Sequence, residues 1–322
     1  MTEHGNDKVS WISETKGFGT LGIVATHSLI CFEPPFFLSV INAGRFCVQL
    51  FFILSAYLTF LSLDKNGIPQ DFREYLKYLL LKIARLFPLM FIMVLWRFAL
   101  RCLETKAVPG LYDSIWLDSF FAITFLNGFS YSHINPWGNW YAGILVMFYV
   151  LAPALKRFAN TSKKTILLFV AAILVDSLSG FLLESHGIDT GWYFYFWFPS
   201  QFPVLILGML FYYFEKESRF MNREIKNSIY TFAFVVVCGF IISKCFHSIM
   251  GTHVQYGILL FSFCYLLFEK SEIKPKFDLL KILGDNSYGI YLFHLCLIPV
   301  MGGGISKLCI KSNALNYILC YN

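Results

Sequence analysis

Residues 46–63 read FCVQLFFILSAYLTFLSL, an apolar stretch that carries no charged side chain. A helix needs about 20 mostly apolar residues to cross the hydrocarbon core of a bilayer. This stretch therefore predicts a transmembrane helix.

Further apolar stretches of similar length lie on both sides of residues 46–63, and together they predict an all-α fold, a polytopic transmembrane helix bundle with nine to ten membrane-spanning helices. The chain is 57% hydrophobic and only 14% charged, whereas a soluble domain carries about 25% charged residues. No internal repeat and no soluble domain is evident, so we expect a single integral-membrane domain over residues 1–322. The candidate spans are 17–38, 46–63, 78–100, 111–127, 138–155, 165–184, 192–214, 228–246, 254–268 and 285–305.

Basic residues are distributed unevenly between these spans. Lys and Arg cluster in 64–85, 156–164, 216–226 and 270–281, and they are absent from 127–137, 185–191 and 247–253. Because loops rich in Lys and Arg stay in the cytoplasm, we expect all four clusters on the cytoplasmic side. Two loops on the same side need an even number of crossings between them, so we expect 111–127 not to cross. The prediction is then nine crossings, with the N-terminus in the cytoplasm and the C-terminus outside.

The same pattern excludes two classes of function. The net charge of +6 comes from these loop clusters, which are typical of a membrane protein, so we do not expect nucleic-acid binding. The nine cysteines form no CxxC pair, and their spacing does not suggest metal ligands, so we expect no metal site. The N-terminus lacks a small-residue cleavage site after its first apolar stretch, so we expect that stretch to stay in the chain.

Several polar residues inside the apolar stretches are candidates for function, because an ionisable side chain in the membrane is costly. His27 and Asp176 each lie well inside a predicted span, and the alternative for each is a hydrogen bond to a neighbouring helix. Lys82 and Arg85 lie three residues apart on one face of a predicted helix. They can contact lipid headgroups or bind the phosphates of a nucleotide-like molecule.

Two further pairs of residues are candidates for function. Trp140 and Tyr141 stand at the predicted non-cytoplasmic end of a span, where aromatic rings often anchor a helix at the membrane surface. Tyr291 and His294 lie three residues apart in the last span, either as core residues or as part of a site.

Taken in order, these elements resemble the acyltransferase-three family of integral-membrane O-acyltransferases. That family has a basic residue eleven positions before a His, here Lys16 and His27, and then a segment that here reads CVQLFFILSA at 47–56. The later elements are a basic-x-x-Arg-x-x-Pro segment, a Trp-led helix that ends in Phe-Tyr-x-x-x-Pro, and Gly-x-x-Ser-Tyr-x-x-Tyr-Leu-x-His. They correspond here to Lys82, Arg85 and Pro88, to Trp140, Phe148, Tyr149 and Pro153, and to Gly284, Ser287, Tyr288, Tyr291, Leu292 and His294.

Three positions depart from the family pattern. Lys16 and Lys82 stand where Arg is usual, and Lys cannot make the planar bidentate contact of Arg. Leu145 stands where many relatives carry Glu, which removes a carboxylate partner from that helix.

The resemblance implies transfer of an acyl group, usually acetyl, from acetyl-CoA or another acyl-CoA to a hydroxyl of an envelope or exported glycan, or of its lipid-linked precursor. It implies His27 as the general base, since a histidine with a pKa near 6.5 suits proton removal from a hydroxyl. Lys16, Lys82 and Arg85 are then expected to bind the CoA phosphates. Trp140, Tyr141, Asp176, Tyr291 and His294 are expected to contribute to substrate binding. The resemblance also implies a location in the bacterial inner membrane.

Two alternatives remain open at this point. A transporter or flippase would also need a polar path through the membrane, although discontinuous helices and an inverted repeat would be expected of it. A relative without acyl transfer, which binds lipid or supports a glycan-export assembly, would fit the three departures. The sequence does not indicate the acceptor, the length of the acyl chain or the oligomeric state.

Overall fold

The computed structural model describes residues 3–28, 44–105, 114–129, 140–188, 194–218, 222–243, 251–269 and 278–294. Every regular element in these ranges is a helix, which confirms the all-α prediction. In chain order the elements are α1 (Glu3–Ser28), η2 (Gly44–Cys47), α3 (Val48–Asn66), α4 (Phe72–Thr105), α5 (Ser114–Ile123), η3 (Leu126–Gly128), α6 (Trp140–Phe158), α7 (Ser162–Ser185), η5 (Phe194–Phe196), α8 (Phe198–Glu217), α9 (Arg223–Ser243), α10 (Thr252–Cys264), η6 (Tyr265–Glu269) and α11 (Asp278–Asp285). After a turn at Asn286 the chain is again helical over 287–294.

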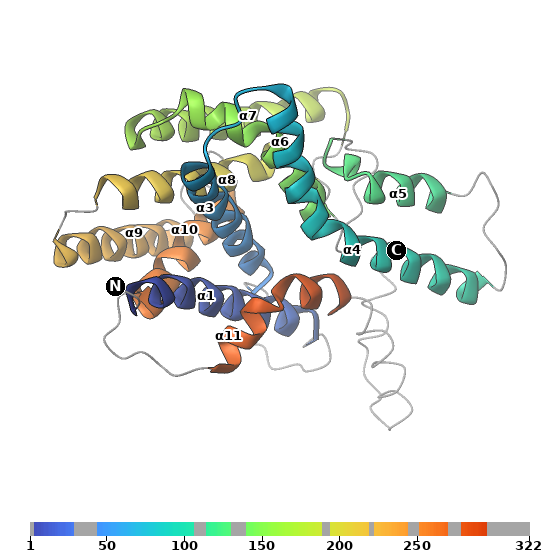
Figure 1. Ribbon diagram of the computed structural model, residues 1–322, viewed down its shortest axis with the longest axis horizontal. Helices are drawn as coiled ribbons and strands as arrows, with labels where there is room; N and C mark the ends of the chain where they lie inside the picture. The colour runs from blue at the N-terminus through green and yellow to red at the C-terminus, as the bar shows by residue number, and fades with distance from the viewer. Residues whose placement is uncertain are drawn as a thin grey trace. The chain divides into compact units, whose positions relative to one another are not determined.

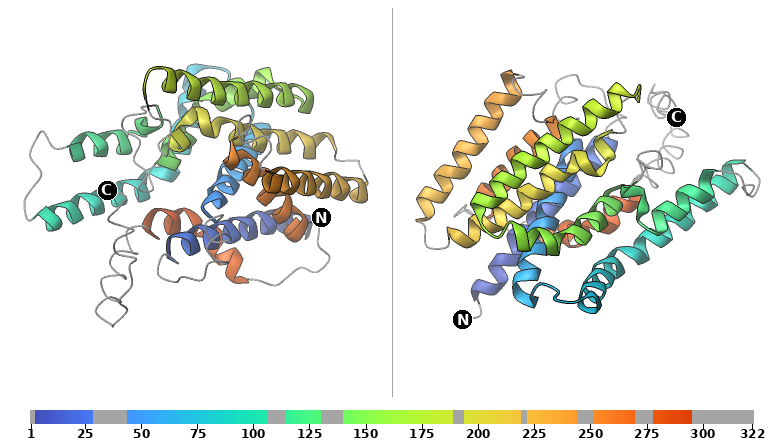
Figure 2. Two further views of the ribbon diagram at one scale, coloured as in Figure 1. Left: turned by 180° about the vertical axis from the view of Figure 1, so that it is seen from behind. Right: turned by 90° about the horizontal axis from the view of Figure 1, so that it is seen from above.

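The helices form two compact units, each described here by itself. The first unit comprises Met1–Phe51 and Leu267–Asn322, and the second comprises Phe52–Leu266. In the first unit α1 packs against α11 and η2. The backbones of α1 and α11 approach so closely that a Cβ at Gly284 would collide with the carbonyl oxygen of Ser13. In the second unit α7 packs on α8, α9 on α10 and α4 on α5, as Figures 1 and 2 show.

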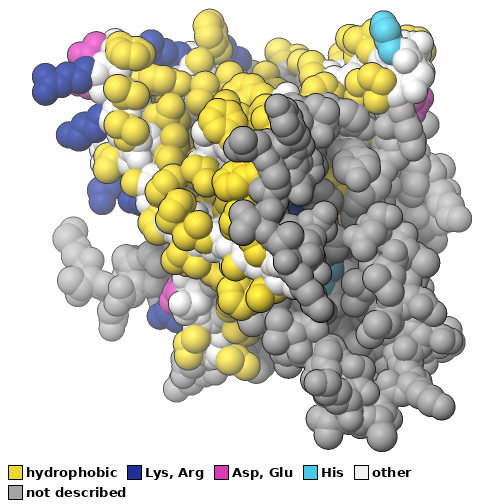
Figure 3. Space-filling view, turned by 90° about the vertical axis from the view of Figure 1, so that its right-hand side faces the viewer, with side chains coloured by type: hydrophobic (Ala, Val, Ile, Leu, Met, Phe, Trp, Pro, Cys, Tyr) yellow, Lys and Arg dark blue, Asp and Glu magenta, His cyan; other side chains and the backbone are white. Residues whose placement is uncertain are grey.

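Two helices of the second unit present broad apolar surfaces. In the most apolar 18-residue stretch of each helix, only 22% of α4 and 11% of α7 is buried inside the protein. Between residues 166 and 182, all exposed residues of α7 except Ser177 are hydrophobic, among them Leu167, Leu174 and Phe181. Figure 3 shows hydrophobic side chains over much of the described part of one face, with Lys and Arg gathered at its edge. Such a surface suits lipid rather than water.

Four of the described helices are long and apolar enough to cross a membrane, namely Gly44–Asn66, Phe72–Leu100, Trp140–Phe158 and Ser162–Ser185. They coincide with four expected spans. The larger number of nine crossings remains a prediction, because α8, α9 and α10 do not meet the same criteria and residues 295–305 lie outside the described ranges.

Two element boundaries differ from expectation. The first helix begins at Glu3, well before residue 17, because its polar N-terminal part can still form helix even though it is not apolar. The last expected span, 285–305, is interrupted at its start by the turn at Asn286.

The segment expected not to cross the membrane is short in the structure. The helix α5 has 10 residues, which makes it about 15 Å long, half the thickness of the hydrocarbon core. It continues into η3, which packs against α6. There a Cβ at Gly128 would meet the backbone of Gly143 at 2.7 Å, so both positions favour glycine. A helix of this length alone is too short to cross the hydrocarbon core.

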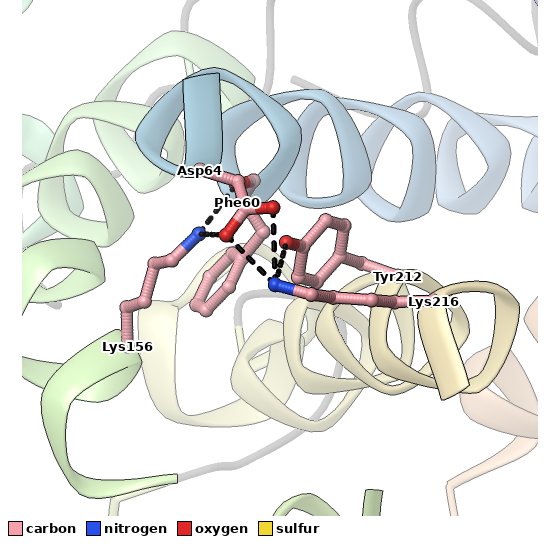
Figure 4. Close-up of polar contacts among 5 residues, drawn as sticks. All are labelled: Phe60, Asp64, Lys156, Tyr212 and Lys216. Carbon is pink, nitrogen blue, oxygen red and sulfur yellow. Dashed lines mark hydrogen bonds and ion pairs between the residues drawn. The ribbon is translucent and has the colours of Figure 1, made fainter. Parts of the chain in front are cut away.

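Three of the basic segments meet at one end of the second unit, which is called the basic end below. Asp64 at the end of α3 pairs with Lys156 of α6 at 3.1 Å and with Lys216 of α8 at 2.9 Å, as Figure 4 shows. The start of α7 joins them, because Ser162 hydrogen-bonds to Glu217. Parts of the segments 64–85, 156–164 and 216–226 therefore lie together at one end of the unit. That this end faces the cytoplasm stays a prediction.

Candidate functional site

The first unit brings two histidines from opposite ends of the chain together. His27 lies in the last turn of α1 and His294 ends the helical segment 287–294. Their rings are 5.1 Å apart between centroids and tilted by 47°. Both are expected site residues, and the sequence alone gave no indication that they would be neighbours.

The hydrogen bonds of His294 assign roles to its two ring nitrogens. Nδ1 lies 2.6 Å from the carbonyl oxygen of Tyr291, and since a carbonyl only accepts, Nδ1 must carry the proton. In the neutral ring Nε2 is then an acceptor. This atom is buried and has no hydrogen-bond partner among the residues that the structure describes. Tyr291 also contacts the imidazole through its own ring, at 5.8 Å, so it orients His294 from two directions.

Lys16 lies on the same helix as His27 and faces an acidic partner that the sequence did not indicate. Asp285, at the end of α11, accepts a hydrogen bond of 2.6 Å from the Ser13 hydroxyl. Burial lowers the pKa of Lys16, while the nearby carboxylate of Asp285 opposes that change. The opposite charge also reduces the positive potential that Lys16 can offer to an anion.

In the second unit Lys82 turns inward and Arg85 outward. The ammonium of Lys82 lies 5.3 Å from the ring of Tyr149 and 5.7 Å from that of Tyr78, a geometry that suits cation–π attraction. Tyr75 joins the same helix pair by donating to the carbonyl of Val150 at 3.1 Å. Arg85 is exposed, but its charge still acts on both Lys82 and Tyr149, so the two cations lie near one another one turn apart. Lys16 belongs to the first unit.

Trp140 and Tyr141 are buried, at 5% and 7% exposure. Their position in the sequence allowed a role as membrane-surface anchors, but side chains buried in the protein do not serve that role. The Tyr141 hydroxyl lies 3.1 Å from that of Ser55. The ring of Phe52 contacts both aromatic residues, with centroids 5.6 Å from Trp140 and 4.7 Å from Tyr141.

Asp176 lies in a polar group that sequence reasoning missed. The carboxyl group of Asp176 on α7 is within hydrogen-bonding reach of the Ser200 hydroxyl on α8. His253 at the start of α10 lies 2.8 Å from the Ser200 carbonyl oxygen and 3.4 Å from its hydroxyl, both measured from Nε2. The only signal for His253 was its place at the edge of an apolar stretch, and Ser200 carried none.

The described residues contain no group of three or more His, Cys, Asp or Glu side chains that could hold a metal ion.

Comparisons with known proteins identify the family of the chain. A family model described as an acyltransferase domain matches residues 9–321, nearly the whole chain. A curated protein of Acidianus two-tailed virus, named "Putative acetyltransferase ORF330", is 23% identical over 295 residues, which cover 90% of this chain and 84% of the viral protein. No solved structure matches the chain.

Proposed function

Because the chain belongs to this acyltransferase domain family, we propose that it is an integral-membrane O-acyltransferase. It moves an acyl group, in the simplest case acetyl, from acyl-CoA to a hydroxyl of an envelope or exported glycan or of a lipid-linked sugar. The proposal includes nine membrane crossings, a cytoplasmic N-terminus and a bacterial plasma membrane as the location.

The observation that carries the proposal is the pair of His27 and His294. A sugar hydroxyl becomes a good nucleophile only when a base takes its proton in the transition state. An imidazole whose Nδ1 is already committed to a backbone carbonyl presents Nε2 as an acceptor, and His294 meets this condition. His27 is close enough for both rings to contact one substrate hydroxyl region.

In the proposed reaction His27 accepts the proton of the sugar hydroxyl while the oxygen attacks the thioester carbonyl. The tetrahedral intermediate then collapses, the C–S bond breaks, and the imidazolium of His27 returns the proton to the departing CoA thiolate. His294 holds the acceptor by taking a hydrogen bond at Nε2, and Tyr291 fixes its ring.

Lys82 and Arg85 are proposed to bind the phosphates of CoA, with Lys16 as a third cation. The support differs between them. Arg85 is exposed and available to a soluble donor, and Lys82 is held by aromatic rings that leave its charge without a carboxylate partner among the interactions described. Lys16 faces Asp285, so we expect its contribution to be the smallest of the three.

The test compares the wild type with His27→Ala and His294→Ala at equal membrane levels, after feeding labelled acetate and isolating surface glycan. We expect the His27 variant to lose about 10² to 10⁴ of the rate, the usual worth of a general base. Wild-type labelling with unchanged labelling in His27→Ala would assign the base elsewhere, with His294 first. A wild type that labels no glycan of its host would favour a transporter or a relative without acyl transfer.

A further inference from the structure

The second unit has a polar cluster at the end opposite its basic end, formed by Asp176, Ser200, Gln201 and His253. Ser200 lies sixteen residues before Lys216 on α8, a distance of about 24 Å along the helix axis. His253 begins α10, whose far end returns toward the basic end, because Tyr265 donates to Glu215 at 2.6 Å. The cluster is thus separated from the basic end by most of the thickness of a bilayer core.

Asp176 reaches this cluster from a helix that otherwise faces outward. The buried residues of α7 are Thr165, Ala172 and Asp176, which form a narrow stripe on one helix face. A carboxyl group at that depth in an apolar helix is costly and marks a functional position by default. On this face the carboxyl group of Asp176 lies near the first turn of α8, where backbone N–H groups favour a negative charge.

Two acceptor atoms of the cluster lack a hydrogen bond in the described part of the chain. They are Oδ1 of Asp176 and Oε1 of Gln201, on side chains that are 7% and 0% exposed. The amide nitrogen of Gln201 is already committed to the carbonyl of Tyr195, at 2.6 Å. Buried polar atoms are almost always paired, so both oxygens call for a ligand that donates hydrogen bonds.

Aromatic rings adjoin His253 of this cluster. Tyr195 lies edge-on to His253 at 5.5 Å, and Trp140 lies 5.6 Å from Tyr195. Rings of this kind exclude water and offer apolar faces, which strengthens nearby hydrogen bonds. A sugar matches the combination, since it carries both hydroxyl donors and apolar C–H faces.

We propose that Asp176, Ser200, Gln201 and His253 bind a sugar unit of the acceptor glycan, with a hydroxyl of that unit donating to Oδ1 of Asp176. This inference rests on the proposed acyltransferase function and adds groups of the second unit that hold the glycan.

The test uses the full chain in lipid nanodiscs free of sugar detergents. The probes are methyl glycosides of neutral hexoses and N-acetylhexosamines, and binding is followed by tryptophan fluorescence. The variants are Asp176→Asn and Ser200→Ala, so that one failure to fold does not end the experiment. The matched control is Glu184→Gln, which makes the same charge change at an exposed position of α7.

We expect at least one glycoside to give a saturable signal with the wild type and the control. Loss of a charged hydrogen-bond acceptor should weaken binding by about tenfold to a hundredfold in Asp176→Asn. The proposal is overturned if no glycoside binds the wild type, if Asp176→Asn binds like the wild type, or if sodium alone reproduces the signal. Release of thiol from acetyl-CoA, measured in parallel, separates the two ideas. Glycoside binding without thiol release would refute the acyltransferase function alone, and transfer that is indifferent to Asp176 would refute this site alone.

Discussion

Replacing Asp64 tests the contact network that holds the basic end together. Lys156 is nearly buried, with 8% of its side chain exposed, and its ammonium donates to Asp64 at 3.1 Å and to the carbonyl of Phe60 at 2.9 Å. Lys216 reaches the same carboxylate from solvent, with 52% of its side chain exposed. Asp64→Asn would therefore leave a buried ammonium with a carbonyl as its main partner and a second ammonium close by.

The magnitude follows from burial. Breaking a fully buried ion pair from one side costs about 3–5 kcal/mol, whereas an exposed pair contributes about 0–1 kcal/mol. Because 40% of the Asp64 side chain is exposed, solvent screens part of the loss, and we expect Asp64→Asn to lower the free energy of unfolding by about 1–3 kcal/mol. Lys156→Met removes the buried charge and keeps the methylene stem, so it should cost about 0–1 kcal/mol.

The assay is reversible unfolding in mixed micelles, with Lys216→Met as the exposed control. The double variant Asp64→Asn/Lys156→Met should be more stable than the sum of the single changes predicts, by about 1 kcal/mol. The reasoning fails if Asp64→Asn costs no more than Lys216→Met, or if Lys156→Met costs more than Asp64→Asn.

Three further predictions concern packing, donor binding and orientation. Gly284→Ala should destabilise the first unit by about 1–3 kcal/mol, because the new Cβ would collide with the Ser13 carbonyl; thermal unfolding measures this, and a wild-type midpoint would contradict the close approach. Lys82→Met should raise the KM for acetyl-CoA by about tenfold, whereas Lys82→Arg should leave the KM close to that of the wild type. The same KM in both variants would show that the charge at position 82 does not contribute to binding. Cysteine introduced at Lys163 should react with a membrane-impermeant maleimide only after cells are opened, and cysteine at Ser185 should react in intact cells, above the wild-type background; the reverse pattern would invert the predicted topology.

Local composition predicted much of the helical fold. Hydropathy located α3, α4, α6 and α7 because each of them must satisfy the bilayer along its whole length. The distribution of Lys and Arg went further, since it predicted that segments far apart in the chain lie on one side, and the contacts of Asp64 and Glu217 place three of them together. It also indicated that residues 111–127 would not cross, which stays a prediction.

The relations between distant side chains were not predictable from these patterns. Hydropathy contains no information about partners, so the approach of His27 to His294 and of Lys16 to Asp285 became visible only in the structure. The same limit explains why Ser200 and His253 were missed, because a serine and a histidine at helix starts are ordinary until Asp176 is placed beside them. The shared helix face of Lys82 and Arg85 was inferred from spacing, but the contact of Lys82 with Tyr149 could not be.

The contrast between α7 and the helices that follow it has a consequence for how the chain enters the membrane during synthesis. The helix α7 is apolar enough to partition into lipid by itself even with Asp176 near its middle, whereas α8 and α9, although 20 and 21 residues long, do not meet the same criteria. Helices of that kind enter lipid at acceptable cost only when an earlier helix covers their polar groups. During synthesis α7 emerges before α8, whose polar residues Ser200 and Gln201 are buried in the folded second unit. Integration of the later helices would then depend on the earlier ones, and a change in α7 would be felt as a failure of biogenesis in the segments made after it.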